Sequence, residues 1–179
     1  MARHIALLRG INLGSRNRVP MPELRQLLAA NGYEDPKTLV QSGNVVLSSR
    51  KRPDTVARDL QALVAERFGI DVPVVVRSRD ELAAVIEANP LDEAVADPKR
   101  FQVSFLSAAP EASVVESLES ADVAPEQIAV RGREIYAWHA GGIQRSPAAK
   151  LLTDAKLGVT ATARNWNTVT RLLELADER

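Results

Sequence analysis

Arginine and asparagine gather with glycine near the start of the chain, and residues of these types can bind anions. The segment from Gly10 to Arg18 contains Asn12, Gly14, Arg16, Asn17 and Arg18. It lies between a short apolar run and a helical pattern, so its amides are expected near a helix N-terminus, which attracts anions. The arginines add charge that suits phosphate or carboxylate. The segment lacks the Gly-Lys-Ser/Thr ending of a P-loop and the glycine spacing of a dinucleotide-binding loop.

A second cluster, Gln41-Ser42-Gly43-Asn44, lies where two β-patterned stretches meet in a hairpin. Loops held by rigid elements often carry binding groups, and Gln41 is an unusual residue beside apolar neighbours. For both clusters a structural interpretation stays open. Asn and Gly satisfy left-handed positions of a connector, and Ser and Asn in a turn cap their own backbone.

The third cluster, Arg164-Asn165-Trp166-Asn167-Thr168, straddles the start of the last expected helix. In a structural role, Asn165 or Asn167 caps this helix and Trp166 packs it against the core. In a functional role, Arg164 pairs with a phosphate or carboxylate, and Trp166 offers its face to a base or ring. Both roles stay open from the sequence.

These clusters lead to the hypothesis of a binding module that holds a small anionic ligand, such as a nucleotide or phosphate ester, between two halves of the chain. The expected ligand-binding residues are Asn12, Arg16, Asn17, Gln41, Ser42, Asn44, Arg164, Asn165 and Trp166. An enzyme acting on such a ligand is a second hypothesis, because Arg and Asn can stabilise charge. Its nucleophile, base and orienting residue cannot all be assigned. A third hypothesis is an interaction protein that covers an open sheet face as a homodimer.

No cofactor and no metal site are expected. The chain has no cysteine and two histidines, His4 and His139, which excludes zinc–thiolate and His-rich sites. The sequence identifies no orienting partner for His139, which disfavours a general base there. The acidic residues Asp92, Glu93 and Asp97 are typical of a solvated linker.

Composition favours a globular cytoplasmic protein without a membrane partner. Apolar residues make up 45% of the chain, and no stretch approaches the ~20 apolar residues of a membrane span. The absence of cysteine suits the reducing cytoplasm. Residues 1–52 carry nine Lys and Arg against three Asp and Glu, whereas residues 91–126 carry two against eight. This uneven charge, with 4% aromatic residues, disfavours nucleic-acid binding.

The first half shows the order strand, helix, strand, strand, helix, strand, helix. Apolar and β-branched runs predict the strands, while helical apolar spacing with Pro, Gly and a capping box marks the helices. The expected strands are 4–9, 38–41, 45–49 and 72–77, and the expected helices begin near Pro22, Pro53 and Ser78.

The second half repeats this order. Its expected strands are 101–106, 127–131, 135–138 and 159–163, and its expected helices cover 114–118, run from Ser146 to Gly158, and begin near Asn165. The sequence therefore predicts an α+β fold of two tandem ferredoxin-like βαββαβ units, each followed by an extra helix. The expected domains are residues 1–90 and 99–179, joined by an acidic linker at 91–98.

Three stretches also resemble a known family. They are LLRGINLGSRNRVPMPELRQLL (7–28), QSGNVVLSS (41–49) and TARNWNTVTRLLEL (162–175). Their order and spacing resemble the family called domain of unknown function 1697 (DUF1697), essentially along the whole chain. Ala163 stands where the family has a second threonine, and Leu39 where it tends to carry an aromatic residue. The resemblance implies a paired ferredoxin-like α+β fold and no particular activity.

Overall fold

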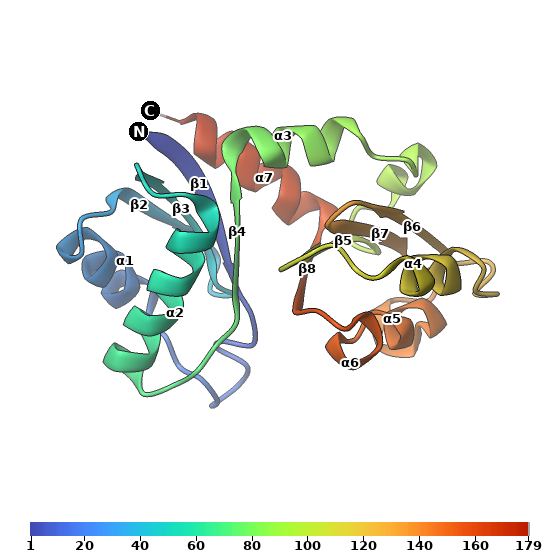
Figure 1. The fold of residues 1–179 in the computed structure, drawn as a ribbon, viewed down its shortest axis with the longest axis horizontal. Helices are drawn as coiled ribbons and strands as arrows, with labels where there is room; N and C mark the ends of the chain where they lie inside the picture. The colour runs from blue at the N-terminus through green and yellow to red at the C-terminus, as the bar shows by residue number, and fades with distance from the viewer. Residues whose placement is uncertain (179) are drawn as a thin grey trace. The chain divides into compact units, whose positions relative to one another are not determined.

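The computed structural model describes residues 1–178, which form two compact units (Figure 1). Unit 1 contains residues 1–84 and the described residues from Arg171 on, and unit 2 contains residues 85–170. The sequence-based division at the acidic segment 91–98 stays a prediction. We describe each unit separately.

Unit 1 is built on a four-stranded antiparallel sheet with the strand order β2-β3-β1-β4. Its successive elements are β1 (Ala2–Leu8), α1 (Met21–Ala30), β2 (Glu34–Leu39), β3 (Asn44–Ser49), α2 (Pro53–Phe68), β4 (Val74–Ser78) and the start of α3 (Arg79–Glu87). Helices α1 and α2 cover one face of this sheet (Figure 1). The core between them contains Ala6 and Leu8 of β1, Leu24 and Leu28 of α1, and Leu60 of α2.

Unit 2 has a second four-stranded antiparallel sheet, in the order β6-β7-β5-β8. Its elements are η1 (Asp92–Ala96), β5 (Phe101–Leu106), α4 (Ala112–Glu119), β6 (Gln127–Arg131), β7 (Glu134–Trp138), η2 (Ile143–Arg145), α5 (Pro147–Leu151), α6 (Asp154–Leu157), β8 (Ala161–Asn165) and α7 (Trp166–Asp177), whose last turns belong to unit 1. Leu106, Ile135 and Leu157 pack in a core between this sheet and its short helices. The protein is therefore α+β, with two antiparallel sheets.

Local capping signals in the sequence are confirmed. The Ser78 amide donates to Glu81 Oε2 at 2.7 Å, and the Glu81 amide donates to Ser78 Oγ at 3.1 Å, which is the predicted capping box at α3. Ser146 Oγ accepts from the Ala149 amide at 2.9 Å and caps α5. Short-range hydrogen bonds of this kind depend on residue spacing alone, so the sequence can reveal them.

Two predicted elements differ most in extent, and the ends of several other strands, such as β4 and β8, shift by one or two residues. The strand predicted at 38–41 is β2, Glu34–Leu39, which contains Pro36. A proline is tolerated there because β2 is an edge strand. The single helix predicted from Ser146 to Gly158 is two short helices, because Thr153 adopts an extended backbone (φ −85°, ψ 151°) that separates them. Within residues 1–178, none of the helices has the length and apolar character needed to cross a bilayer.

Candidate functional site

The loop after β1 is held in a fixed shape by its asparagines. Asn12 and Asn17 both have left-handed backbones, with φ of 52° and 50°. The Asn17 side-chain amide donates to the Gly10 carbonyl at 2.9 Å, and the Asn12 main-chain amide donates to the Asn17 carbonyl at 2.9 Å. Asn12 Oδ1 accepts from the Val19 amide at 2.9 Å. These side chains therefore satisfy the turn and leave it preorganised.

Asn12 also joins this loop to the β2–β3 turn. Its Nδ2 donates to the Gln41 carbonyl at 2.7 Å and to the Val19 carbonyl at 2.9 Å. Two residues further along the turn, the Gly43 carbonyl accepts from the Leu8 amide at 2.8 Å. A Cβ built on Gly43 would lie 2.8 Å from Leu8 Cβ, and Gly43 has φ of 86°, so only glycine fits this approach. The structure thus brings the first two clusters together.

At the end of the turn the Asn44 side chain is buried, whereas Ser42 is exposed. Asn44 is fully buried, and its Nδ2 donates to the Leu39 carbonyl at 3.1 Å and to Ser42 Oγ at 2.9 Å. Asn44 and Ser42 consequently shape the turn, and a ligand at the surface would contact Gln41 rather than Asn44.

Other side chains of the same two loops are exposed to solvent instead of bonding to the backbone. Within residues 1–178, the side chains of Arg16, Arg18 and Gln41 are exposed and have no hydrogen-bond or ion-pair partner. Two aliphatic side chains lie on these loops as well: Leu13 is 64% exposed and Val40 is 62% exposed. The loops therefore carry two uncompensated cations and two exposed aliphatic side chains, on a backbone that hydrogen bonds hold in place.

The third cluster lies in unit 2 and is mostly engaged in structure. Asn165 Oδ1 accepts from the Thr168 amide at 2.9 Å, which makes Asn165 the cap of α7. Trp166 is buried and its ring stacks on Phe101, with centroids 5.0 Å apart. The half-buried Arg164 donates to Thr162 Oγ1 at 2.8 Å, and burial lowers its pKa to about 10, so it remains protonated at neutral pH.

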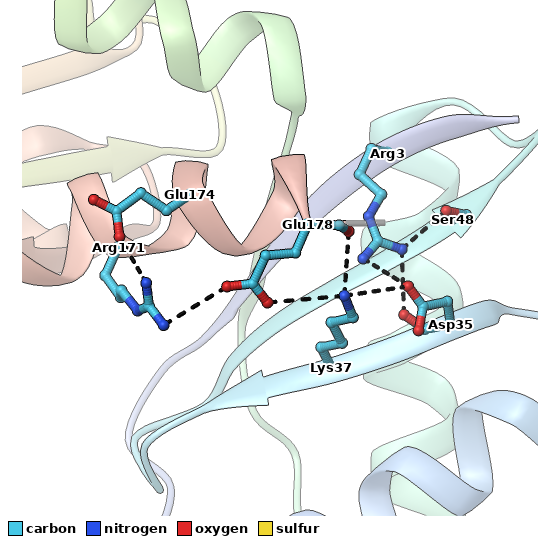
Figure 2. Close-up of polar contacts among 7 residues, drawn as sticks. All are labelled: Arg3, Asp35, Lys37, Ser48, Arg171, Glu174 and Glu178. Carbon is cyan, nitrogen blue, oxygen red and sulfur yellow. Dashed lines mark hydrogen bonds and ion pairs between the residues drawn. The ribbon is translucent and has the colours of Figure 1, made fainter.

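A hollow of about 540 Å³ in unit 1 was not foreseen from the sequence. It is bordered by Arg3 of β1, Asp35 of β2, Arg79 of α3 and the end of α7. Figure 2 shows the network on one side of it: Arg3 contacts Asp35 at 2.9 Å and Ser48 at 3.0 Å, while Lys37 lies between Asp35 and Glu178. On the other side, Arg79 binds both carboxylate oxygens of Asp177, at 2.8 and 3.0 Å.

The charges around this hollow are already neutralised. Each of the cations Arg3, Lys37 and Arg79 contacts an acidic side chain, and two of those acids come from the end of α7. The Arg79 guanidinium holds the pKa of Asp177 below its usual range. The network therefore fastens the end of α7 to the sheet of unit 1, and it offers an added anion no free cation.

Sequence reasoning also missed a buried polar chain in unit 2. His139 Nδ1 lies 2.7 Å from Ser146 Oγ, and Ser146 Oγ donates to Glu126 Oε2 at 2.8 Å. The Ala148 amide donates to the same carboxylate oxygen at 2.9 Å. His139 and Ser146 are each 1% exposed, so this chain caps α5 in the interior and does not meet solvent. The Ser-Pro cap was the only local signal for it, because Glu126 lies 20 residues before Ser146.

Within the described residues, no three His, Asp or Glu side chains gather in a way that could hold a metal ion. Arginine side chains can recognise charge, and exposed side-chain amides can form hydrogen bonds. The protein is thus an α+β protein of two antiparallel sheets. The exposed cations on the loops of unit 1 form its candidate anion-binding surface.

Comparison with known proteins agrees with this fold. The model of the family described as Protein of unknown function (DUF1697) matches residues 1–136, so the chain belongs to this family. The matched region includes the first two clusters and ends before the third. The solved structure of the conserved bacterial protein SP0830 from Streptococcus pneumoniae is similar, with 23% identity, a TM-score of 0.78, and coverage of 98% of this chain and 99% of that one. The search of curated proteins finds no match.

Proposed function

We propose that the protein binds a small anionic ligand, such as a nucleotide or a phosphate ester, and that the loops of unit 1 carry the contact. One observation supports this most directly: Arg16 and Arg18 are exposed and unpaired on a preorganised loop. Guanidinium groups bind phosphate and carboxylate with two parallel hydrogen bonds, and little ordering is required when the loop is already fixed.

In this proposal the nine expected residues have different tasks. Arg16 and the Gln41 amide contact the ligand, with Arg18 as an added cation. The asparagines and Ser42 hold the backbone, because their side chains bond to the loop and turn. Asn165 and Trp166 keep the start of α7 in place, and Arg164 is a separate candidate cation of unit 2.

We also propose that each unit is a ferredoxin-like βαββαβ unit and that the protein works in the cytoplasm. The element order and the strand orders β2-β3-β1-β4 and β6-β7-β5-β8 support the first statement. The absence of cysteine supports the second.

Calorimetry with a panel of nucleotides and simple phosphates tests the proposed function. The double variant Arg16→Ala/Arg18→Ala is expected to lose binding, because it removes both free guanidinium groups. Arg50→Ala/Arg52→Ala is the matched control: these residues are also exposed and basic, but they follow the end of β3 opposite to the Gln41–Asn44 turn. A separate Arg164→Ala variant shows whether unit 2 contributes. The proposal is wrong if no anion in the panel binds, or if both double variants weaken binding equally.

A further inference from the structure

The exposed residues Leu13 and Val40 lie on the same pair of hydrogen-bonded loops as the free arginines. Leu13 follows Asn12 and Val40 precedes Gln41, the two residues joined by the 2.7 Å hydrogen bond between loop and turn. The Arg16 amide donates to the Leu13 carbonyl at 3.1 Å, which places Leu13 and Arg16 across one tight turn. Leu13 and Arg16 are therefore close along the backbone, and the loop that carries them is hydrogen-bonded to the turn that carries Val40.

The fold itself does not require these aliphatic side chains. Val40 has φ of 51°, a left-handed conformation that is rare and strained for a β-branched residue. Asn or Gly would adopt it more easily. With 62% of its surface in solvent, the Val40 side chain also gains little from burial. Strain at an exposed position is typical of a contact site.

We infer that the ligand of this surface is an amphiphilic anion, meaning a phosphate or carboxylate joined to an aliphatic or aromatic group. The inference rests on the proposed function, since Arg16 and Arg18 bind the charged end. Leu13 and Val40 then cover the apolar end and are themselves removed from water. An anion without an apolar group would use only half of the surface.

Two matched probes separate the charged and apolar contributions: inorganic phosphate and hexyl phosphate, each titrated by calorimetry. Burial of two or three methylenes, at about 0.8 kcal/mol each, makes hexyl phosphate bind about 15- to 50-fold more tightly. The double variant Leu13→Ser/Val40→Asn is expected to bring the ratio of the two affinities, hexyl phosphate over inorganic phosphate, close to one while phosphate binding remains. Arg16→Ala/Arg18→Ala is expected to lose both probes.

Controls keep a folding defect apart from a binding defect. Val40→Asn tolerates the left-handed backbone, so the variant is expected to be at least as stable as the parent. Ile143→Ser removes another exposed aliphatic side chain, 45% exposed in unit 2, and is expected to leave the ratio unchanged. Flotation with phosphatidylglycerol vesicles is compared with titration of free hexyl phosphate. The comparison shows whether the amphiphilic anion comes from a lipid surface or from solution. Binding that depends on Leu13 and Val40 in either experiment supports an amphiphilic ligand.

The outcomes distinguish this inference from the proposed function. If inorganic phosphate binds through the two arginines and hexyl phosphate binds no more tightly, the amphiphilic ligand is excluded and the anion site stands. The same conclusion holds if Leu13→Ser/Val40→Asn leaves a large ratio unchanged. If neither probe binds the parent protein, both proposals fall.

Discussion

The loop from Gly10 to Arg18 and the segment from Arg164 to Thr168 contain similar residues in different surroundings. In unit 1, the asparagines bond to the backbone and leave Arg16 and Arg18 exposed to solvent. In unit 2, the asparagine caps a helix, Trp166 is buried and Arg164 bonds to Thr162. The asparagines have the same task in both, which is to satisfy backbone groups.

What separates the two segments is the exposure of the charged and aromatic side chains. An exposed guanidinium without a partner can bind a ligand at little cost, whereas a half-buried one that is already hydrogen-bonded must first lose the bonds that compensate its desolvation. In our proposal, the segment of unit 1 therefore contacts the ligand, whereas most of the segment of unit 2 stabilises the fold.

The largest expected effect is the replacement of Trp166. Trp166→Ala removes a buried ring stacked on Phe101, and should lower the free energy of unfolding by about 3–5 kcal/mol. Arg16→Ala, at an exposed position, should change it by less than about 0.5 kcal/mol. Urea unfolding followed by circular dichroism measures both. Equal effects of the two substitutions would show that our comparison of the segments is wrong.

A second test compares two glycines of unit 1. Gly43→Ala should lower the free energy of unfolding by about 3 kcal/mol, because a left-handed φ of 86° and a Cβ 2.8 Å from Leu8 Cβ act together. Gly14→Ala, with φ of 60° and open space around it, should cost about 1 kcal/mol. Circular dichroism is the right signal, since both tryptophans, Trp138 and Trp166, lie in unit 2. A similar cost at both positions would mean that the turn can move away from β1.

The elements and their caps could be predicted from the sequence because their signals are local. Apolar periodicity, Ser78-x-x-Glu81 and Ser146-Pro147 act within a few residues. The boundaries of β2 could not be predicted, since Pro36 usually argues against a strand and is accepted only through its place at the edge.

The candidate site was predictable only in part, because the sequence shows local signals but not tertiary contacts. Residue types indicated the loops, but not which side chains would be free. The bond from Asn12 to the Gln41 carbonyl joins residues 29 apart, and it decides that Asn12 serves the backbone. Likewise, Lys37 and Glu178 are 141 residues apart, so the network of Figure 2 follows from tertiary structure alone.

A smaller effect tests the cap of α7. Asn165→Ala should lower the free energy of unfolding by about 1 kcal/mol, since Asn165 Oδ1 accepts from the Thr168 amide. Asn167→Ala is the control, because Asn167 is exposed on the first turn and its side chain makes no capping hydrogen bond within residues 1–178; the substitution should be close to neutral. Tryptophan fluorescence during urea unfolding reports on this unit. A larger cost at Asn167 would reverse the assignment of the cap.

The smallest expected effects are on the pH dependence of stability, which the protonation of the two buried histidines should influence. Desolvation lowers the pKa of both His4 in unit 1 and His139 in unit 2 below the ordinary value of 6.5, although Glu126 opposes this at His139. The unfolded chain then binds more protons than the folded chain as the pH falls below about 6.5, so the free energy of unfolding should decrease from that pH downward.

Leucine variants separate the two histidines. The ring nitrogens of His4 lie near the backbone of Ser49 and Lys51 but make no well-formed hydrogen bond within residues 1–178, so His4→Leu should weaken the pH dependence with little loss of stability at pH 8. His139→Leu should also weaken it, but at a cost of about 1 kcal/mol at pH 8, because Ser146 Oγ loses a partner at 2.7 Å. Urea midpoints between pH 8 and pH 5 measure both. If either variant keeps the full pH dependence of the parent, carboxylates elsewhere must cause it, and the contrast between an unpaired histidine in unit 1 and a paired one in unit 2 has no effect on stability.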